Sequence, residues 1–528
     1  MDLLALYAQA TPGKTALVDD HAGVMRQLTY AELDVEANRF ANVLVDQGLG
    51  AGKKVAWCGP NSLDVVVLLC AAQRLGATAV PVNYRFTDPE AAYVIAHSDA
   101  TLVFVDAELA PMVGRIRGEI PAVRSVLVFG GECPQSADGW LASADDLVAT
   151  AATTPPPLGD AAAYAAMMIY TSGTTAKPKG ALRKMASPDP AAAGAFVALV
   201  GYTTDDVYIT TGPLYHSGPL GFMTLAYALG QTVVVQRKFD AEDWLRLVET
   251  YRCTSTFSAP TPMRTICNLP SDVLDRYDRS SLRIMIANAA PWSMALKRRY
   301  LDVFPQESLF EVYGSTELSV NTILLPADQL RKPGSCGKEL PMVEIRLYDD
   351  DGNIVTGVGP EASGELYVRS GSVFDDYYKQ SDKYAEDHRE GFQTVGDIAY
   401  RDEAGYLYIC DRKRDMIISG GVNIYPAEIE AALELHPDIY EVAVFGIPSD
   451  EWGEAVHAVI VPRPRSALDT SRDESIVVGH ARQHLAGFKV PRTVSWLDEL
   501  PKTGSGKILK RELRQPFWER DAQETTPP

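Results

Sequence analysis

The sequence predicts an α/β protein in which a large N-terminal domain precedes a small α+β C-terminal domain. Residues 1–150 alternate helical periodicity with short apolar runs, a pattern typical of a parallel sheet covered by helices. From residue 343 short β-type segments replace this alternation, which predicts a β-rich subdomain. The stretch 411–528 mixes helical and strand patterns again and has the length of a small separate domain. We therefore expect domains at 1–410 and 411–528.

The elements of the first half follow from local patterns. Apolar residues at helical spacing predict a helix over Tyr30–Gln47, and the apolar run Lys54–Cys58 before Gly59 and Pro60 predicts a buried strand. A helix over Ser62–Leu75 and a strand over 77–83 repeat this unit. Similar units continue to about Pro326. Strands that alternate with helices in this way indicate parallel pairing.

The second half is predicted to contain shorter strands. Asp351 and Gly352 lie between two β-type runs, which predicts a hairpin over 343–355. Proline near the first turn favours a helix over Pro426–Leu435. The remaining expected elements are strands over 441–448, 454–462 and 493–501 and a helix over 475–485. Together they predict a small α+β unit.

Composition and charge exclude several classes of protein. The 528 residues are 46% hydrophobic and 22% charged, which excludes disordered, collagenous and coiled-coil chains. The net charge of −20 makes nucleic acid and anionic membranes poor partners, so an anionic ligand needs a local cluster of donors. The apolar stretches Val65–Ala72 and Ala161–Tyr170 are too short for a membrane span, and the N-terminus has no signal-peptide pattern. Seven scattered cysteines without a C-x-x-C pair predict free thiols and a cytoplasmic protein.

The strongest local signal is the segment Tyr170–Gly180, YTSGTTAKPKG. Glycine lets backbone N–H groups approach a ligand, hydroxyls donate to oxyanions, and lysines supply positive charge. The candidate phosphate-binding residues are Thr171, Ser172, Gly173, Thr174, Thr175 and Lys179. The segment is not a Walker A loop, and its alternative interpretation is a solvated polar turn.

This segment resembles the signature loop of the adenylate-forming superfamily, which contains acyl-CoA synthetases, peptide-synthetase adenylation domains and firefly-type luciferases. Five further signatures follow in the family's order: PLYHSGPL (213–220), YGSTE (313–317), TVGDIAY (394–400), ICDRKRDMIISGGVNIYPAEIE (409–430) and PKTGSGKILK (501–510). The resemblance implies a large N-terminal domain with ATP and acyl sites. It also implies a mobile C-terminal domain that carries a catalytic lysine.

The resemblance assigns nucleotide contacts position by position. Tyr313 and the adjoining Gly314 correspond to the adenine-stacking position, Thr316 to a contact with the α-phosphate, and Glu317 to a Mg²⁺ ligand. Asp397 and Arg412 correspond to ribose contacts, and a carboxylate suits a vicinal diol because both of its oxygens accept hydrogen bonds. The adenine slot corresponds to Asn288, Ala289 and Ala290, where the family more often has glycine.

The remaining assignments concern catalysis and coenzyme A. Lys507 corresponds to the lysine that bridges the substrate carboxylate and the α-phosphate, and His216 to the aromatic gate between the ATP and acyl sites. Arg414 occupies the hinge position, where the family usually has Asp or Lys. The expected CoA-binding residues are Ser419, Gly420, Gly421, Phe488, Lys489 and Arg492, and the last three are equally compatible with ordinary packing.

The resemblance implies an ATP-dependent acid–CoA ligase that uses Mg²⁺ and forms acyl-AMP and then acyl-CoA. No Asp follows His216 as in amino-acid-activating domains, which favours an acid without an α-amino group. A fatty acid is the first expectation, and a steroid or bile acid, or an aryl acid, is the alternative. Two other hypotheses stay open: transfer to a carrier protein, and a non-catalytic nucleotide-binding relative. A homodimer is left open as the assembly.

Overall fold

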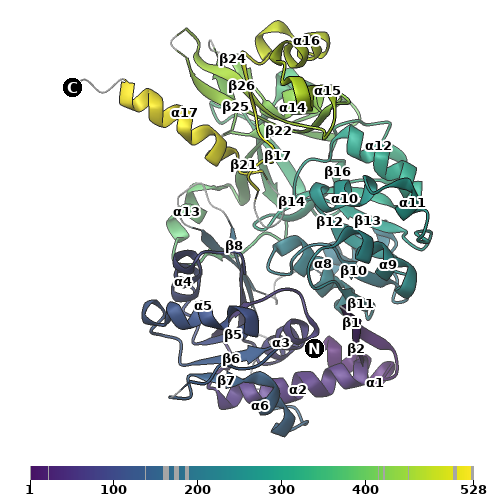
Figure 1. The fold of residues 1–528 in the computed structure, drawn as a ribbon, viewed down its shortest axis with the longest axis vertical. Coiled ribbons are helices and arrows are strands. Elements are labelled where there is room, and N and C mark those ends of the chain that lie inside the picture. The colour runs from purple at the N-terminus through teal and green to yellow at the C-terminus, as the bar shows by residue number, and fades with distance from the viewer. Residues whose placement is uncertain are drawn as a thin grey trace.

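The computed structural model describes residues 2–21, 23–136, 138–157, 166–171, 178–184, 190–413, 415–419, 422–449, 451–502 and 508–524. Four sheets organise these residues (Figure 1). We call the part with the first three sheets, up to β22 (Leu407–Arg412), the large lobe. The part from β23 (Ile417–Ser419) onward is the small lobe.

The nine-stranded sheet of the large lobe has a parallel centre and antiparallel edges. Its strand order is β16-β15-β14-β13-β12-β10-β11-β1-β2, and β1, β11, β10, β12, β13 and β14 run parallel. The strands are β1 (Thr15–His21), β2 (Val24–Thr29), β10 (Val207–Thr210), β11 (Thr232–Val235), β12 (Ser255–Ser258), β13 (Ile284–Ala287), β14 (Leu309–Ser315), β15 (Ser319–Leu324) and β16 (Lys338–Glu339).

The eight-stranded sheet has the order β19-β9-β8-β4-β3-β5-β6-β7 and contains the parallel strands predicted for the N-terminal region. Its strands are β3 (Lys54–Cys58), β4 (Thr78–Val82), β5 (Leu102–Asp106), β6 (Ser125–Phe129), β7 (Leu141–Ser143), β8 (Ala166–Thr171), β9 (Lys179–Lys184) and β19 (Asp376–Tyr377). Strand β19 comes from far along the chain and pairs antiparallel with β9.

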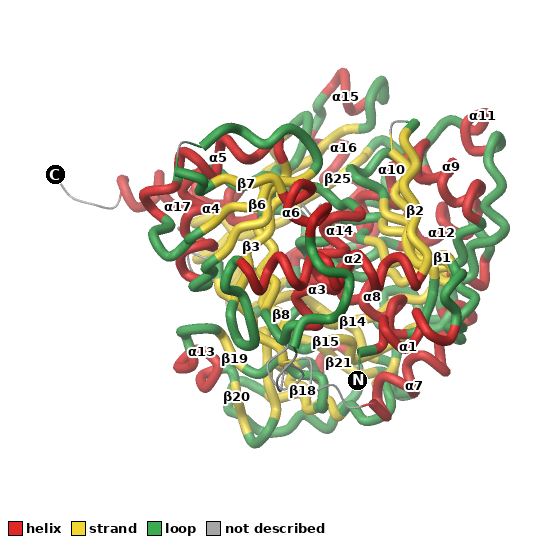
Figure 2. The backbone as a smooth tube through the Cα atoms, turned by 90° about the horizontal axis from the view of Figure 1, so that it is seen from below, coloured by secondary structure: helices red, strands yellow, loops and turns green. Residues whose placement is uncertain are grey.

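Helices cover both sheets and fill the space between them. Apolar side chains of α2 (Tyr30–Asp46), α3 (Leu63–Arg74) and α8 (Ser217–Ala228) form one core with both sheets, and Figure 2 shows these helices between the strands. The outer faces carry α4 (Asp88–His97), α5 (Ala110–Arg115), α9 (Ala241–Tyr251), α10 (Pro260–Cys267) and α12 (Met294–Val303). The other helices of this lobe are α1 (Leu3–Ala10), α6 (Ala144–Thr150), α7 (Pro190–Val200), α11 (Ser271–Leu274) and α13 (Ser381–Glu386).

The third sheet is the β-rich subdomain. It consists of β17 (Glu344–Tyr348), β18 (Gly364–Arg369), β20 (His388–Arg389), β21 (Phe392–Arg401) and β22, with the order β17-β18-β21-β20 and β22 on β21. The hairpin predicted over 343–355 is present only as a short reversal: one antiparallel bridge joins Tyr348 to Ile354 and Val355 N donates to the carbonyl of Leu347 at 2.8 Å, but its second run forms no strand. Gly352 forms the turn with φ +84°, but β17 takes β18 as its ladder partner instead.

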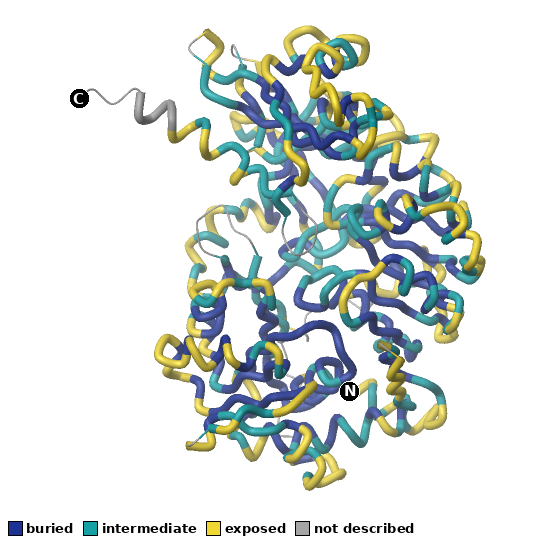
Figure 3. The backbone as a smooth tube through the Cα atoms, viewed as in Figure 1, coloured by how far each residue is buried: buried dark blue, intermediate teal, exposed yellow. Residues whose placement is uncertain are grey.

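The small lobe is an α+β unit as predicted. Its sheet contains β23, β24 (Val422–Ile424), β25 (Ile439–Ser449), β26 (Gly453–Pro462) and β27 (Thr493–Trp496). Its helices are α14 (Pro426–Leu433), α15 (Ala467–Ser471), α16 (Glu474–His484) and α17 (Lys510–Glu524). Figure 3 shows buried backbone along its strands under a more exposed helical surface.

Two observations on the described residues concern the expected free thiols and the expected lack of a membrane span. All seven cysteines are free thiols. No helix among the described residues combines the length and the apolar character that crossing a bilayer requires.

Acid is expected to destabilise the small lobe through His457. Its ring nitrogens contact the hydroxyl oxygens of Thr493 at 2.7 Å and Ser495 at 2.9 Å, and burial lowers the pKa of this imidazole to about 4. Because an unfolded histidine titrates near pH ~6.5, the unfolded state binds more protons between these values, and stability falls as the pH drops through this window. The loss is about 3 kcal/mol at most.

Urea unfolding of wild type and His457→Gln tests this expectation. The wild type should lose more unfolding free energy than the variant between about pH 7 and about pH 4.5. An equal loss in both proteins would show that His457 is not the acid-sensitive group.

Candidate active site

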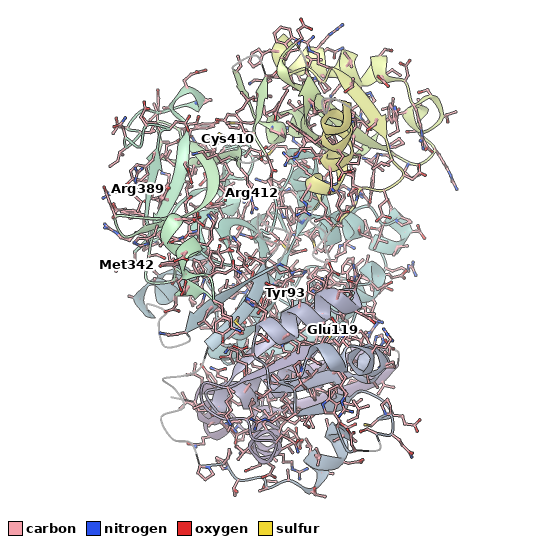
Figure 4. All side chains as sticks on the ribbon, turned by 90° about the vertical axis from the view of Figure 1, so that its left-hand side faces the viewer. Tyr93, Glu119, Met342, Arg389, Cys410 and Arg412 are labelled. Carbon is pink, nitrogen blue, oxygen red and sulfur yellow. The ribbon has the colours of Figure 1, made fainter. Side chains whose placement is uncertain are left out.

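A cavity of about 1810 Å³ lies where the sheets of the large lobe meet the small lobe. Its wall includes residues of β8, β9, α8, β14 and β22 and the segment Glu499–Lys502 of the small lobe. Figure 4 labels Cys410 and Arg412 on β22, at the junction of the β-rich subdomain and the small lobe. The segments that carry the sequence signatures therefore converge on one space.

Glu317 is a buried carboxylate at the wall of this cavity, with only 8% of its surface exposed. Its Oε1 accepts hydrogen bonds from the hydroxyls of Thr171 at 3.1 Å and Tyr377 at 3.2 Å. The pKa of Tyr377 is raised because burial and the Glu317 charge both disfavour the phenolate, so the phenol remains a donor. Hydroxyls from two distant strands thus orient one carboxylate.

The setting of Glu317 fits a hard cation. No described residue donates to its Oε2, so that oxygen can face the cavity. Mg²⁺ takes oxygen ligands and is held in proteins by one or two carboxylates together with substrate phosphates. Glu317 and the phosphates of a bound nucleotide would together hold the cation.

Thr316 is held beside Glu317 by two groups. Its hydroxyl lies 2.7 Å from that of Ser217 at the start of α8, and its carbonyl accepts from Arg183 Nη2 at 2.9 Å. The same guanidinium also donates to the carbonyl of Ser372. Gly314 is required upstream, because a Cβ there would lie 1.8 Å from the carbonyl oxygen of Ser319. The YGSTE segment is thereby fixed against β9 and α8.

Asp397 accepts from Tyr313 and lies against Arg412. The Tyr313 hydroxyl donates to Asp397 Oδ2 at 2.6 Å, and Arg412 Nε lies 3.3 Å from Oδ1. Burial and the Asp397 charge raise the pKa of Tyr313 well above its usual value, so its hydroxyl stays protonated. Arg412 and Gly314 belong to the described cavity wall, whereas Tyr313 and Asp397 stand directly behind it.

The segment expected at the adenine slot is partly on the wall. Asn288 and Ala289 line the cavity, and Ala290 follows outside the described wall. Ala289 has φ +74°, the left-handed region that glycine enters freely and alanine rarely adopts. This backbone conformation explains why the resembling sequences more often have glycine here. Asn288 fixes the segment, because its side chain donates to the carbonyl of Val312 at 2.6 Å.

Lys179 and His216 also face the cavity. Lys179 is 4% exposed, its Nζ lies 5.4 Å from the centre of the Tyr377 ring, and burial lowers the pKa of its ammonium. Burial, aided by the charge of Arg85, lowers the pKa of His216 to about 4, so the imidazole is neutral at neutral pH. Within the described residues His216 Nε2 has no hydrogen-bond partner. Buried polar atoms normally have a hydrogen-bond partner, so a bound ligand would be expected to hydrogen-bond to this nitrogen.

The small lobe contributes the base of a hairpin to the wall. Pro501 and Lys502 line the cavity, Lys502 forms a β-bridge with Ile508, and Leu509 N donates to the carbonyl of Pro501 at 2.8 Å. Leu500 and Ile508 pack into an apolar cluster on β25 and β26, which anchors this base. Of the residues that flank the segment 503–507, Lys502 therefore lines the cavity, and Ile508 is bridged to it.

Other residues expected at the site lie away from the cavity. Lys489 pairs with Glu428 at 2.7 Å and Phe488 is 48% exposed, while Arg492 lies 5.6 Å from the ring centre of Trp452. Ser419 ends β23 next to Gly453. The present lobe orientation does not bring these four to the cavity wall. Ser172, Gly173, Thr174, Thr175, Arg414, Gly420, Gly421 and Lys507 lie outside the described residues.

Sequence reasoning missed Arg183, Ser217 and Tyr377 as supports of the YGSTE segment. Arg183 lies four residues beyond Lys179 on β9, and Tyr377 is separated from Glu317 by 60 positions. Only Ser217 belonged to a quoted signature, within PLYHSGPL. Nothing in the local sequence distinguishes the other two from ordinary strand residues.

Comparisons with known proteins agree with this arrangement. The family model described as AMP-binding enzyme matches residues 4–378, and that described as AMP-binding enzyme C-terminal domain matches 428–507. The chain is 34% identical to the indoleacetate–CoA ligase of Aromatoleum aromaticum over 96% of both chains. It is 31% identical to the long-chain-fatty-acid–CoA ligase FadD13 of Mycobacterium tuberculosis over 98% of both. The ATP-bound structure of MatB from Rhodopseudomonas palustris superimposes with a TM-score of 0.83, 30% identity and 98% coverage of each chain.

Proposed function

The chain belongs to the AMP-binding enzyme family and is an acid–CoA ligase that uses ATP, Mg²⁺ and CoA, and we propose that its acid is a fatty acid. The observation that carries this choice is the shape of the acyl side of the cavity. Ser217, Gly221, Leu225 and Ala228 line it along one face of α8. These positions span about 16 Å at 1.5 Å per residue, which suits an elongated chain.

An aryl acid is the second candidate, and a specific contact favours it. The rings of Phe222 and Phe257 stack with centroids 5.0 Å apart, and Phe196 adds a third ring 6.2 Å from Phe222. All three line the cavity, and flat aromatic walls pack well on a ring. The relatives act by name on both classes, an indole acid and long-chain fatty acids.

In the first half-reaction we assign positioning and charge neutralisation to the chain. A carboxylate oxygen of the acid attacks the α-phosphorus of ATP, and the bond to pyrophosphate breaks. Lys179 and Lys507 are proposed to neutralise the reacting oxygens, and Thr316, Thr171 and the loop residues 172–175 to donate hydrogen bonds to them. Bound Mg²⁺, held by Glu317, would offset charge on the phosphates. Asp397 and Arg412 are proposed to fix the ribose, and the segment 288–290 with Tyr313 the adenine.

In the second half-reaction the CoA thiol attacks the acyl carbonyl, and AMP leaves as the thioester forms. We propose that the small lobe turns about Arg414. The boundary expected between residues 410 and 411 falls inside β22, whose Asp411 and Arg412 still pair with β21, so we place the start of the turning part after β22. This turn would bring Ser419 and the glycines that follow to the cavity, and Phe488, Lys489 and Arg492 toward CoA. Neutral His216 is proposed to separate the nucleotide and acyl spaces. The seven free thiols support a cytoplasmic location.

Changing the far end of the acyl space tests the substrate proposal. Leu225→Trp should block the cavity near the end of α8, because Leu225 is half-buried and lines it. The variant should lose about tenfold or more in kcat/KM for long-chain acids while keeping activity on short acids. The measurement is thioester formation with a panel of short-, medium- and long-chain saturated acids and aryl acids.

Leu199→Trp is the matched control, because Leu199 is 40% exposed on the neighbouring α7. It should leave the panel unchanged. If the wild type prefers aryl acids and Leu225→Trp changes no chain-length preference, the fatty-acid proposal is wrong and the aryl acid takes its place. Acyl-AMP that accumulates in the presence of CoA would instead indicate a carrier-protein acceptor.

A further inference from the structure

The two lobes are joined by an arginine of the large lobe that reaches two acids of the small lobe. Arg264, on α10, lies with Nη2 3.3 Å from Glu434 Oε1 and Nη1 3.4 Å from Glu441 Oε1. Its Nη1 also approaches the carbonyl of Tyr440 at 3.4 Å. The side chains of Arg264 and Glu434 are each 18% exposed, so the contact is largely shielded from solvent. Guanidinium is suited to this arrangement because its planar fork can serve two carboxylates at once.

Glu441 connects this arginine to the hairpin base at the cavity. It is the more buried of the two acids, with 5% of its side chain exposed on β25. Lys502 Nζ lies 2.8 Å from Oε1 and 2.7 Å from Oε2 of the same carboxylate. Lys502 in turn lines the cavity and is bridged to Ile508, so it closes the base of the segment that contains Lys507.

We propose that Arg264, Glu441 and Lys502 form an interlobe triad that stabilises the present lobe orientation, with Lys502 at the cavity wall, during acid activation. The three are positioning residues, because they act on the reaction through the hairpin and contact no reacting atom. This inference rests on the proposed function, in which Lys507 serves only the first half-reaction.

The two contacts of Glu441 differ in what a lobe rotation does to them. Glu441 and Lys502 both belong to the small lobe, so their pair moves as one unit. Arg264 belongs to the large lobe, so its contacts with Glu441 and Glu434 exist only in the present orientation. Loss of Arg264 therefore weakens this orientation without changing the small lobe itself. Glu441 would be left with one cation instead of two.

Separate assays of the two half-reactions test the triad. Arg264→Ala should lower the rate of acid-dependent pyrophosphate release about tenfold or more, since the arginine contacts two acids of the small lobe at once. Thioester formation from supplied acyl-AMP and CoA should stay within about threefold of wild type or rise. Arg264→Lys keeps the charge but not the planar fork. Its rate of pyrophosphate release should lie between those of the wild type and Arg264→Ala.

Controls separate this effect from a general loss of folding or activity. Arg276→Ala removes a 54% exposed arginine that pairs with Glu242 on the large lobe, and it should leave both half-reactions unchanged. Glu434→Gln removes the charge of one of the two acids that Arg264 contacts, and it should show a smaller loss of the same kind. Combined with Arg264→Ala it should add little further loss, because the two residues share one contact.

Three outcomes would overturn the triad: Arg264→Ala unchanged in both half-reactions, an equal loss in both, or losses for Arg264→Ala and Glu434→Gln that simply add. Failure of the proposed function is distinguishable, because the wild type itself would then release no pyrophosphate with any acid.

Discussion

Lys507→Ala is expected to lose acyl-AMP formation by about 100- to 1000-fold, the range seen when one preorganised charge-stabilising donor is removed. A compact ammonium neutralises the carboxylate and the α-phosphate as they are pressed together, and no other small-lobe lysine is assigned that role. The described flanks support the expectation, because Lys502 lines the cavity and is bridged to Ile508. The measurement is pyrophosphate release with a good acid substrate.

The same variant should form thioester from supplied acyl-AMP and CoA with a much smaller loss, because we propose a different lobe orientation for that step. Arg511→Ala is the matched control, since Arg511 is an exposed cation four residues further along. It should behave as wild type in both assays. An equal loss of both half-reactions in Lys507→Ala would remove the role assigned to Lys507.

The sequence predicts the fold well wherever local pattern decides it. The parallel strands β3 and β4 and the helices α2, α3, α14 and α16 follow from periodicity and turn residues, and all are present within two residues of the expected bounds. The hairpin at Gly352 fails because turn chemistry fixes only the reversal of the chain. The partner of β17 is chosen by packing, and the core of this subdomain unites Leu347 with Leu366 on β18.

The residues of the candidate site also fall into two groups: those predictable from local sequence and those that only the tertiary fold places. Glu317, Thr316 and His216 stand in short signatures, so their place at one cavity was predictable. The roles of Tyr377 and Arg264 were not predictable, because each depends on a contact with a residue far away in the sequence. The paired strands β9 and β19 bring Tyr377 to Glu317, and the orientation of the lobes brings Arg264 to Glu441. The fold alone creates these contacts.

Lobe orientation also explains which expected residues are missing from the cavity. Among the described residues, Thr171, Lys179, Thr316, Glu317 and Arg412 of the expected adenylation set line the cavity, whereas Phe488, Lys489 and Arg492 lie elsewhere on the small lobe. Sequence resemblance assigns the adenylation residues and the CoA-binding residues to one active site. It does not say which lobe orientation brings each set to the cavity. Under the proposed rotation the two sets would occupy the cavity in turn, and in the present arrangement Lys502 of the small lobe lines its wall.

Glu317→Gln is expected to lower acyl-AMP formation by about 100-fold or more and to raise the Mg²⁺ concentration needed for half-maximal rate. The amide keeps the shape of the carboxylate, and its oxygen can still accept from Thr171 and Tyr377, so the fold should hold. What it loses is the negative charge that a hard cation requires. The measurement is pyrophosphate release as a function of Mg²⁺ at saturating ATP.

Tyr377→Phe is the matched control for this prediction, because it removes one of the two hydrogen bonds that orient Glu317 while leaving the charge. Its loss should be about tenfold, the lower end of what one hydrogen bond to a charged group is worth, because Thr171 still donates to Glu317. Its Mg²⁺ dependence should shift less than that of Glu317→Gln. If Glu317→Gln kept the wild-type Mg²⁺ dependence, the carboxylate would be a structural acceptor for Thr171 and Tyr377. The cation would then have to be held by other groups.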